Sequence, residues 1–64
     1  NKLEWKLQAA NQQLPEKQRV LFNLRYYDEI PYEKMSRVLE TSEGALKASY
    51  HHAVKKIEDF ILNS

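Results

Sequence analysis

The sequence contains no cysteine, only one glycine and only two prolines. Without cysteine the chain can form neither a disulfide framework nor a thiolate metal site, and a reducing, cytoplasmic compartment is the simplest expectation. So few glycines and prolines predict few and short loops. No apolar run approaches the roughly 18 residues that a membrane-spanning helix needs, and no signal peptide is recognisable, so we expect no membrane partner.

Length and charge narrow the possibilities further. A chain of 64 residues forms one small domain, which buries only about 60% of the surface that its unfolded chain exposes. Its 42% hydrophobic and 30% charged residues indicate a globular fold rather than disorder. The net charge of +1 is weak for a nucleic-acid binder, so only the distribution of charge can favour DNA. The chain begins at Asn1 without a methionine and enters periodic sequence at once, which suggests a fragment of a longer protein.

The first half of the chain predicts two helices. An apolar stripe at i, i+4, i+7 and i+11 consists of Leu3, Leu7, Ala10 and Leu14. It predicts an amphipathic helix over about residues 3 to 12, with Trp5 off the stripe. Pro15 suits the first position of a second helix, because a missing N–H has no intrahelical partner there. That helix should run to about Tyr27.

The second half predicts two more helices and no strand. Pro31 opens a short third helix whose inner face consists of Tyr32, Met35, Ser36 and Leu39. After a turn at residues 40 to 42, Ser42 is a good N-cap for a fourth helix that ends near Leu62. The core stripe of this helix consists of Leu46, Tyr50, Ala53, Ile57 and Phe60. We therefore expect an all-α, four-helix domain.

The opposite side of the fourth helix is small near its start and basic further along. Its members are Gly44, Lys47, Ala48, His51 and Lys55, with His52 at the margin. A short helix, a tight turn and a longer helix with a polar outer face make the helix-turn-helix pattern, in which the second helix enters the DNA major groove. Small residues permit close approach, and Lys47, Ser49 and the two histidines can donate hydrogen bonds to phosphates or base edges. The outward N–H groups of residues 42 to 45 suit a phosphate. An ordinary solvated face is the alternative for this helix alone.

The segment from Leu14 to Ala53 resembles region 4, the C-terminal promoter-binding domain of bacterial sigma-70-family factors, in particular the small extracytoplasmic-function (ECF) type. The opening motif L-P-x-x-Q-R…F…L-R is matched by Leu14, Pro15, Gln18, Arg19, Phe22, Leu24 and Arg25. The motifs Y-E-E-I-A, S-x-G-T-V-K and H-R-A are matched by Tyr32, Glu33, Met35, Ser36, Ser42, Gly44, Leu46, Lys47, His51 and Ala53. The similarity covers about residues 3 to 62, and several motifs at fixed mutual spacing make it specific.

The sequence departs from the family pattern at a few positions. Glu40 stands where the family usually has glycine, so the turn must form without it. Pro31 stands where the family often has serine, and Ser49 and His52 where it usually has arginine. These differences bear on phosphate affinity and promoter sequence more than on the fold.

The resemblance implies a fold, a function and partners. The fold would be a region 4 architecture, winged-helix-like but without a wing, that fills residues 1–64 as one domain of a longer sigma factor. The domain would bind the minus-35 promoter element with its fourth helix while docked on the flap of the RNA polymerase β-subunit, and an anti-sigma factor could cover the same surfaces. The residues facing DNA would be Tyr32, Glu33, Ser42, Gly44, Lys47, Ala48, Ser49, His51 and His52. Those contacting polymerase or an anti-sigma factor would be Leu3, Trp5 and Leu7.

Other functions have less support in the sequence. His51 and His52 are adjacent on a helix and point about 100° apart, so they cannot chelate a metal together, and we expect neither metal nor cofactor. No nucleophile–base pair and no phosphate-cradling glycine loop suggests an enzyme. Two alternatives remain: a helical protein-interaction domain that uses Trp5 and the first stripe, and another helix-turn-helix regulator, such as the dimerising response-regulator type.

Overall fold

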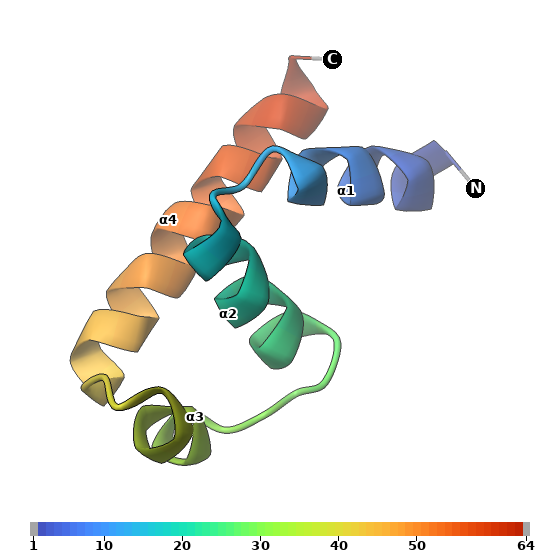
Figure 1. Ribbon diagram of the computed structural model, residues 1–64. Helices are drawn as coiled ribbons and strands as arrows, with labels where there is room; N and C mark the ends of the chain where they lie inside the picture. Colours follow the sequence, from blue (N-terminus) through green and yellow to red (C-terminus); the bar gives the residue numbers. More distant parts are fainter. Residues whose placement is uncertain (1, 64) are drawn as a thin grey trace.

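The longest helix of the structure contacts each of the other three. In the computed structural model, which describes residues 2–63, this helix is α4 (Glu43–Leu62), and the others are α1 (Lys2–Gln12), α2 (Glu16–Tyr26) and α3 (Tyr32–Leu39). Figure 1 shows α1 beside the C-terminal part of α4, α2 crossing its middle and α3 lying at its start. Within the described residues there is no strand, so the predicted all-α class is confirmed.

The apolar stripe of α4 is the surface on which the other helices pack. Leu46, Ala53 and Ile57 are buried, and Tyr50 and Phe60 are half-buried between them, as the periodicity predicts. No helix among residues 2–63 is long and apolar enough to cross a membrane.

The core consists of two clusters along α4. One joins α1, α2 and the second half of α4 through Ala10, Leu14, Phe22, Ala53 and Ile57. The other joins α2, α3 and the first half of α4 through Leu21, Met35 and Leu46. Tyr50 packs against both clusters, and it therefore connects the two ends of the domain.

Two members of the predicted inner faces are more exposed than expected. Leu3 is 63% exposed, because burial along α1 is concentrated at its C-terminal end, where Ala10 and Asn11 lie. Leu39, at the last position of α3, is 37% exposed. Leu3 is the second residue of α1, and Leu39 is the last residue of α3.

Each proline lies one residue earlier in its helix than predicted. Pro15 and Pro31 have ψ angles of 149° and 148°, which are extended, so both are N-caps rather than first helical residues. The carbonyl of Pro15 accepts from the Arg19 N–H at 2.9 Å, and that of Pro31 accepts from the Met35 N–H at 3.0 Å. Proline is suitable at this position because the helix needs only its carbonyl.

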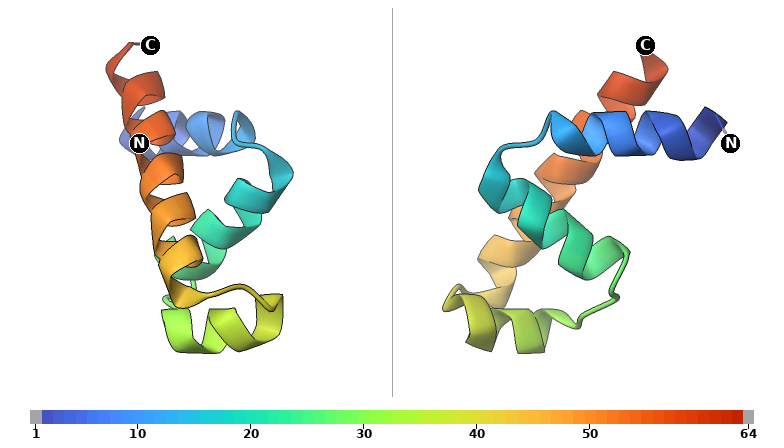
Figure 2. Two further views of the ribbon diagram at one scale, coloured as in Figure 1. Left: turned by 90° about the vertical axis from the view of Figure 1, so that its left-hand side faces the viewer. Right: turned by 45° about the vertical axis from the view of Figure 1, so that its right-hand side comes forward.

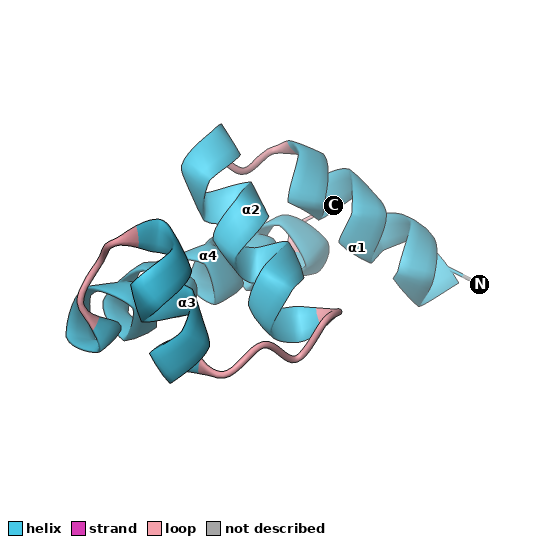
Figure 3. Cartoon of the chain, turned by 60° about the horizontal axis from the view of Figure 1, so that its bottom comes forward, coloured by secondary structure: helices cyan, strands magenta, loops and turns pink. Residues whose placement is uncertain are grey.

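Both loops that flank α3 depend on a glutamate in the left-handed region. Glu29 and Glu40 each have φ of 52°, in the loops drawn pink on either side of α3 in Figure 3. At Glu40 the chain ends α3 by donating its N–H to the Ser36 carbonyl, and the Thr41 N–H donates to the same oxygen at 3.2 Å. The turn thus forms without glycine, but a side chain with a Cβ is strained in this conformation.

We expect Glu40→Gly to raise the free energy of unfolding by about 1 kcal/mol, because glycine adopts φ of this sign without a Cβ clash. Chemical denaturation of the variant and the wild type measures the difference. The matched control is Glu58→Gly in the exposed interior of α4, which should lower stability by about 1 kcal/mol. Equal destabilisation by both substitutions would show that Glu40 is not strained.

Candidate nucleic-acid interface

Helices α3 and α4 form the predicted helix-turn-helix. Residues 40–42 separate the two helices, and Met35 of α3 packs with Leu46 of α4 in the cluster shared with α2. Figure 2 shows α3 crossing the start of α4 at the end of the molecule away from α1. Helix α3 therefore braces the N-terminal half of α4 and leaves its other side uncovered.

Ser42 holds the start of α4, as predicted. Its hydroxyl oxygen accepts from the Ala45 N–H at 3.2 Å, and its carbonyl accepts from the Leu46 N–H at 3.0 Å. Two residues later, a Cβ added to Gly44 would meet nothing within 4 Å. Packing therefore does not require glycine at position 44, and the open space beside it lies at the positive end of the helix dipole.

The outer face of α4 is exposed where the sequence predicts it. Gly44, Lys47, Ala48, His51 and His52 are all exposed. The two histidine rings lie edge to face with centroids 6.2 Å apart. Among residues 2–63 no three His, Cys, Asp or Glu side chains are arranged to hold a metal ion. This face offers small residues and hydrogen-bond donors to a partner.

Ser49 lies apart from the other candidates. It is half-buried and lines a groove of about 600 Å³ between the start of α2 and the α3–α4 turn. Leu39, Thr41 and Leu46 line the same groove. The structure thus does not bring Ser49 together with Lys47 and His51 on the outer face.

Tyr32 lies where α2, α3 and α4 meet, and two cations lie over its ring. The Lys47 Nζ is 5.7 Å and the Arg25 Cζ 5.1 Å from the ring centroid. Both distances are in the range of cation–π interactions. The sequence predicts no site role for Arg25, because its place at the Tyr32 ring depends on how α2 packs against α3 and α4. The arrangement brings one cation from α2 and one from α4 to the Tyr32 ring.

Burial raises the pKa of Tyr50, which lies behind this cluster. Tyr32 adds to the increase and Arg25 opposes it. The Tyr50 phenol therefore stays neutral at physiological pH and places no negative charge behind the cations.

Glu33 lies at the start of α3 with its carboxylate in solvent. It forms an exposed pair with Arg37 at 4.0 Å, a contact of the kind that contributes little stability. The ion pair of Glu33 is therefore with a residue of its own helix rather than with Arg25 or Lys47.

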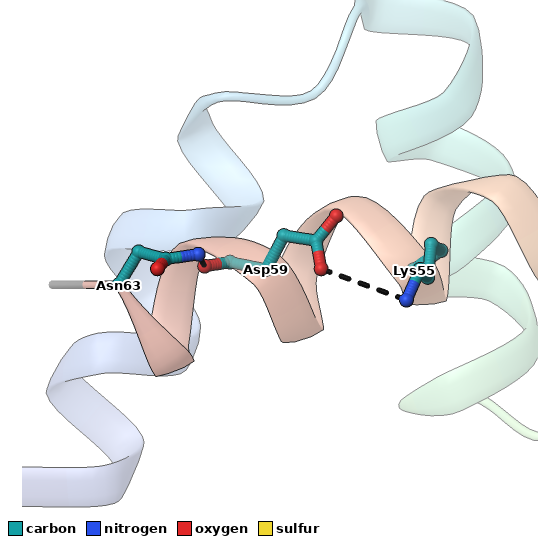
Figure 4. A network of polar contacts seen from close by, with 3 residues as sticks. All are labelled: Lys55, Asp59 and Asn63. Carbon is teal, nitrogen blue, oxygen red and sulfur yellow. Dashed lines mark hydrogen bonds and ion pairs between the residues drawn. The ribbon is translucent and has the colours of Figure 1, made fainter.

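The lysines in the second half of α4 contact other side chains of the protein. The Lys55 Nζ lies 3.7 Å from the Asp59 carboxylate, and the Asn63 amide donates to the Asp59 carbonyl at 2.7 Å (Figure 4). The Lys56 Nζ donates to Gln18 of α2 at 3.3 Å. These contacts leave Lys47, in the first half of α4, as the lysine of this helix that has no side-chain hydrogen bond or ion pair within residues 2–63.

A second candidate surface lies between α1 and α2. Trp5 and Leu3 are 67% and 63% exposed. Leu7, the third residue of this predicted contact, is half-buried and packs against the core. A cavity of about 490 Å³ is lined by Trp5, Gln8, Ala9, Asn11, Gln12, Asn23 and Tyr27. In its wall the Asn11 amide donates to Asn23 at 2.7 Å, which links the two helices.

A model of the family described as "Sigma-70, region 4" matches residues 4–57. The matched segment contains every candidate DNA-facing residue and Trp5, while Leu3 precedes it. No curated protein and no solved structure matches the chain. The family resemblance predicted from the motifs is confirmed over most of the chain.

We expect Ser42→Ala to lower the free energy of unfolding by about 1 kcal/mol, because the Ala45 N–H loses its acceptor. Ser42→Asp supplies a different cap oxygen and should retain most of the stability. Thermal unfolding of the two variants makes the comparison. An equal loss in both would mean that the hydroxyl acts through something other than the cap.

Proposed function

This chain belongs to the sigma-70 region 4 family, and from that premise we propose that the first half of α4 reads the minus-35 element of its promoters. The family is non-enzymatic and binds this element in transcription initiation. The observation that carries the proposal is the capped start of α4, which α3 braces on one side while Gly44, Lys47 and Ala48 are exposed on the other.

The side chains on this surface have distinct roles in the proposal. Lys47, His51 and His52 donate to base edges or nearby phosphates, while Gly44 and Ala48 let the backbone approach the groove. Ser42 and the first N–H groups of α4 receive a phosphate. Tyr32 and Glu33 lie near the DNA backbone at the start of α3. Ser49 lies beside the groove at the edge of this surface, and this position is the reason to keep it among the proposed DNA-facing residues.

The proposal extends to the ECF subtype and to docking on polymerase. The opening residues Leu14 and Pro15, with Gln18 and Arg19, support the subtype. A chimera tests the subtype. This chain should replace region 4 of an ECF-type factor in transcription from a promoter whose minus-35 element this chain binds. Failure there, with success in a primary sigma factor, would reject the subtype.

Trp5 and Leu3, beside the α1–α2 cavity, form the proposed contact with the polymerase flap. An anti-sigma factor would cover the same surface in competition. The exposure of Trp5 also supports the alternative that the chain is a protein-interaction domain whose basic helix is only solvated. The two readings differ in whether α4 binds DNA at all.

Selection of bound sequences from a random duplex pool, with and without the flap fragment, tests promoter recognition directly. A shared motif of minus-35 type is the expected result. Recovery of unrelated sequences in both conditions would reject sequence-specific recognition.

Lys47→Ala should weaken binding to the selected duplex and lower the slope of log affinity against log salt by about one unit, if a phosphate is its target. Fluorescence anisotropy across a salt series measures both quantities. The matched control is Lys2→Ala, an exposed lysine at the far end of α1, which should leave both unchanged. Unaltered binding by Lys47→Ala would favour the interaction-domain alternative.

Trp5 is the only tryptophan, so its fluorescence reports on the α1–α2 surface. Addition of the flap fragment should shift the emission to shorter wavelength, because an exposed indole loses its contact with water. Trp5→Ala should weaken flap binding, measured by calorimetry, while its affinity for the selected duplex stays the same. An unshifted spectrum at saturating flap concentration would place the docking site elsewhere.

A further inference from the structure

The Tyr32 ring is the shared neighbour of two cations that come from different helices. Arg25 reaches it from α2 and Lys47 from α4, at 5.1 Å and 5.7 Å from the ring centroid. Tyr32 itself belongs to α3. Residues of α2, α3 and α4, the three helices at the proposed DNA-facing end, thus meet at the Tyr32 ring.

We propose that Tyr32 is a positioning residue, whose ring holds Lys47 and Arg25 together so that they meet the DNA backbone as one two-cation phosphate site. The inference rests on the proposed promoter-binding function and assigns to Tyr32 a role that acts through its two neighbours. What it adds is a reason why a domain of net charge +1 can still present concentrated positive charge.

The Tyr32 ring offers its negative face to both cations. Two like charges held at one ring repel each other, and the negative ring face offsets that repulsion. The ion pairs among residues 2–63 join Arg37 to Glu33 and Lys55 to Asp59, and neither includes Arg25 or Lys47. Both cations over Tyr32 therefore keep their charge for an external anion.

The Tyr32 ring also restrains the conformations of the Lys47 and Arg25 side chains. Lysine and arginine side chains lose much rotamer freedom when they are fixed, and this loss weakens binding if it occurs only on contact with DNA. A ring that already restrains both side chains lowers that loss. Preorganisation of this kind favours the bound state without adding a contact to DNA.

The Tyr32 ring is itself held in place by other aromatic rings. Tyr32 meets Tyr50 edge to face at 6.4 Å, and Tyr50 stacks on Phe22 at 5.7 Å. Phe22 is 2% exposed. The Tyr32 ring, at the first position of α3, is therefore connected to the core through successive ring contacts.

Three variants separate the ring's electrostatic role from packing and from a direct contact by the hydroxyl. Tyr32→Phe removes the hydroxyl and keeps the ring face. Tyr32→pentafluorophenylalanine keeps the shape and removes the negative face. Tyr32→Leu removes the ring. Their affinities for a short duplex carrying the sequence selected by the wild-type chain are compared at low salt, with thermal unfolding measured on each.

Tyr32→Phe is the reference for the fluorinated variant, because both lack the hydroxyl and only Tyr32→Phe keeps the negative ring face. The fluorinated variant should bind about two- to fivefold more weakly than Tyr32→Phe at similar thermal stability. In a background carrying Arg25→Ala and Lys47→Ala, fluorination should have no effect, because the ring then has no cation to hold. In the free protein, the Lys47 side-chain methylene resonances should show a ring-current shift that Tyr32→Leu abolishes.

Several outcomes overturn the proposal. Equal affinities of the Phe and fluorinated variants would show that the ring face is not used, and a loss in Tyr32→Phe as large as in Tyr32→Leu would assign the effect to the hydroxyl. If Tyr32→Leu does not fold, the comparison of the Phe and fluorinated variants decides the matter. Failure of the wild type to bind any duplex rejects the promoter-binding function and this inference together, whereas normal wild-type binding without a fluorination effect rejects only this inference.

Discussion

Burial of one stripe of α4 is the interaction on which the rest of the structure depends. Helices α1, α2 and α3 each pack against α4, and the core residues Leu46, Ala53 and Ile57 lie along it. Helix α3 has only eight residues, too few for a stable isolated helix in water. Helix α3 therefore exists because Met35 can pack with Leu46.

The four helices could be predicted because burial imposes a period on the sequence and helix ends have chemical signals. The α4 stripe and the Ser42 cap are of this kind, and both are confirmed. The prolines were placed one residue too far into their helices, since sequence alone does not distinguish an N-cap from the first helical position. Leu3 follows the apolar periodicity but is exposed, near the N-terminal end of α1.

The candidate site was only partly predictable for the same reason. Exposure of Gly44, Lys47 and His51 follows from their position opposite the stripe, so it could be predicted along one helix. The approach of Arg25 to Tyr32 depends on the crossing of α2 with α3 and α4, which no single period encodes. The side position of Ser49, beside the groove, likewise depends on where α2 begins.

Tyr50 packs against both core clusters, and this has a consequence for how the domain unfolds. Each cluster is small, and each loses packing contacts if Tyr50 moves. Local opening at the α3 end therefore removes packing from the α1 end, so the two ends open as one cooperative unit rather than as two independent ones. Amide protons at the two ends are thereby expected to share a common opening free energy.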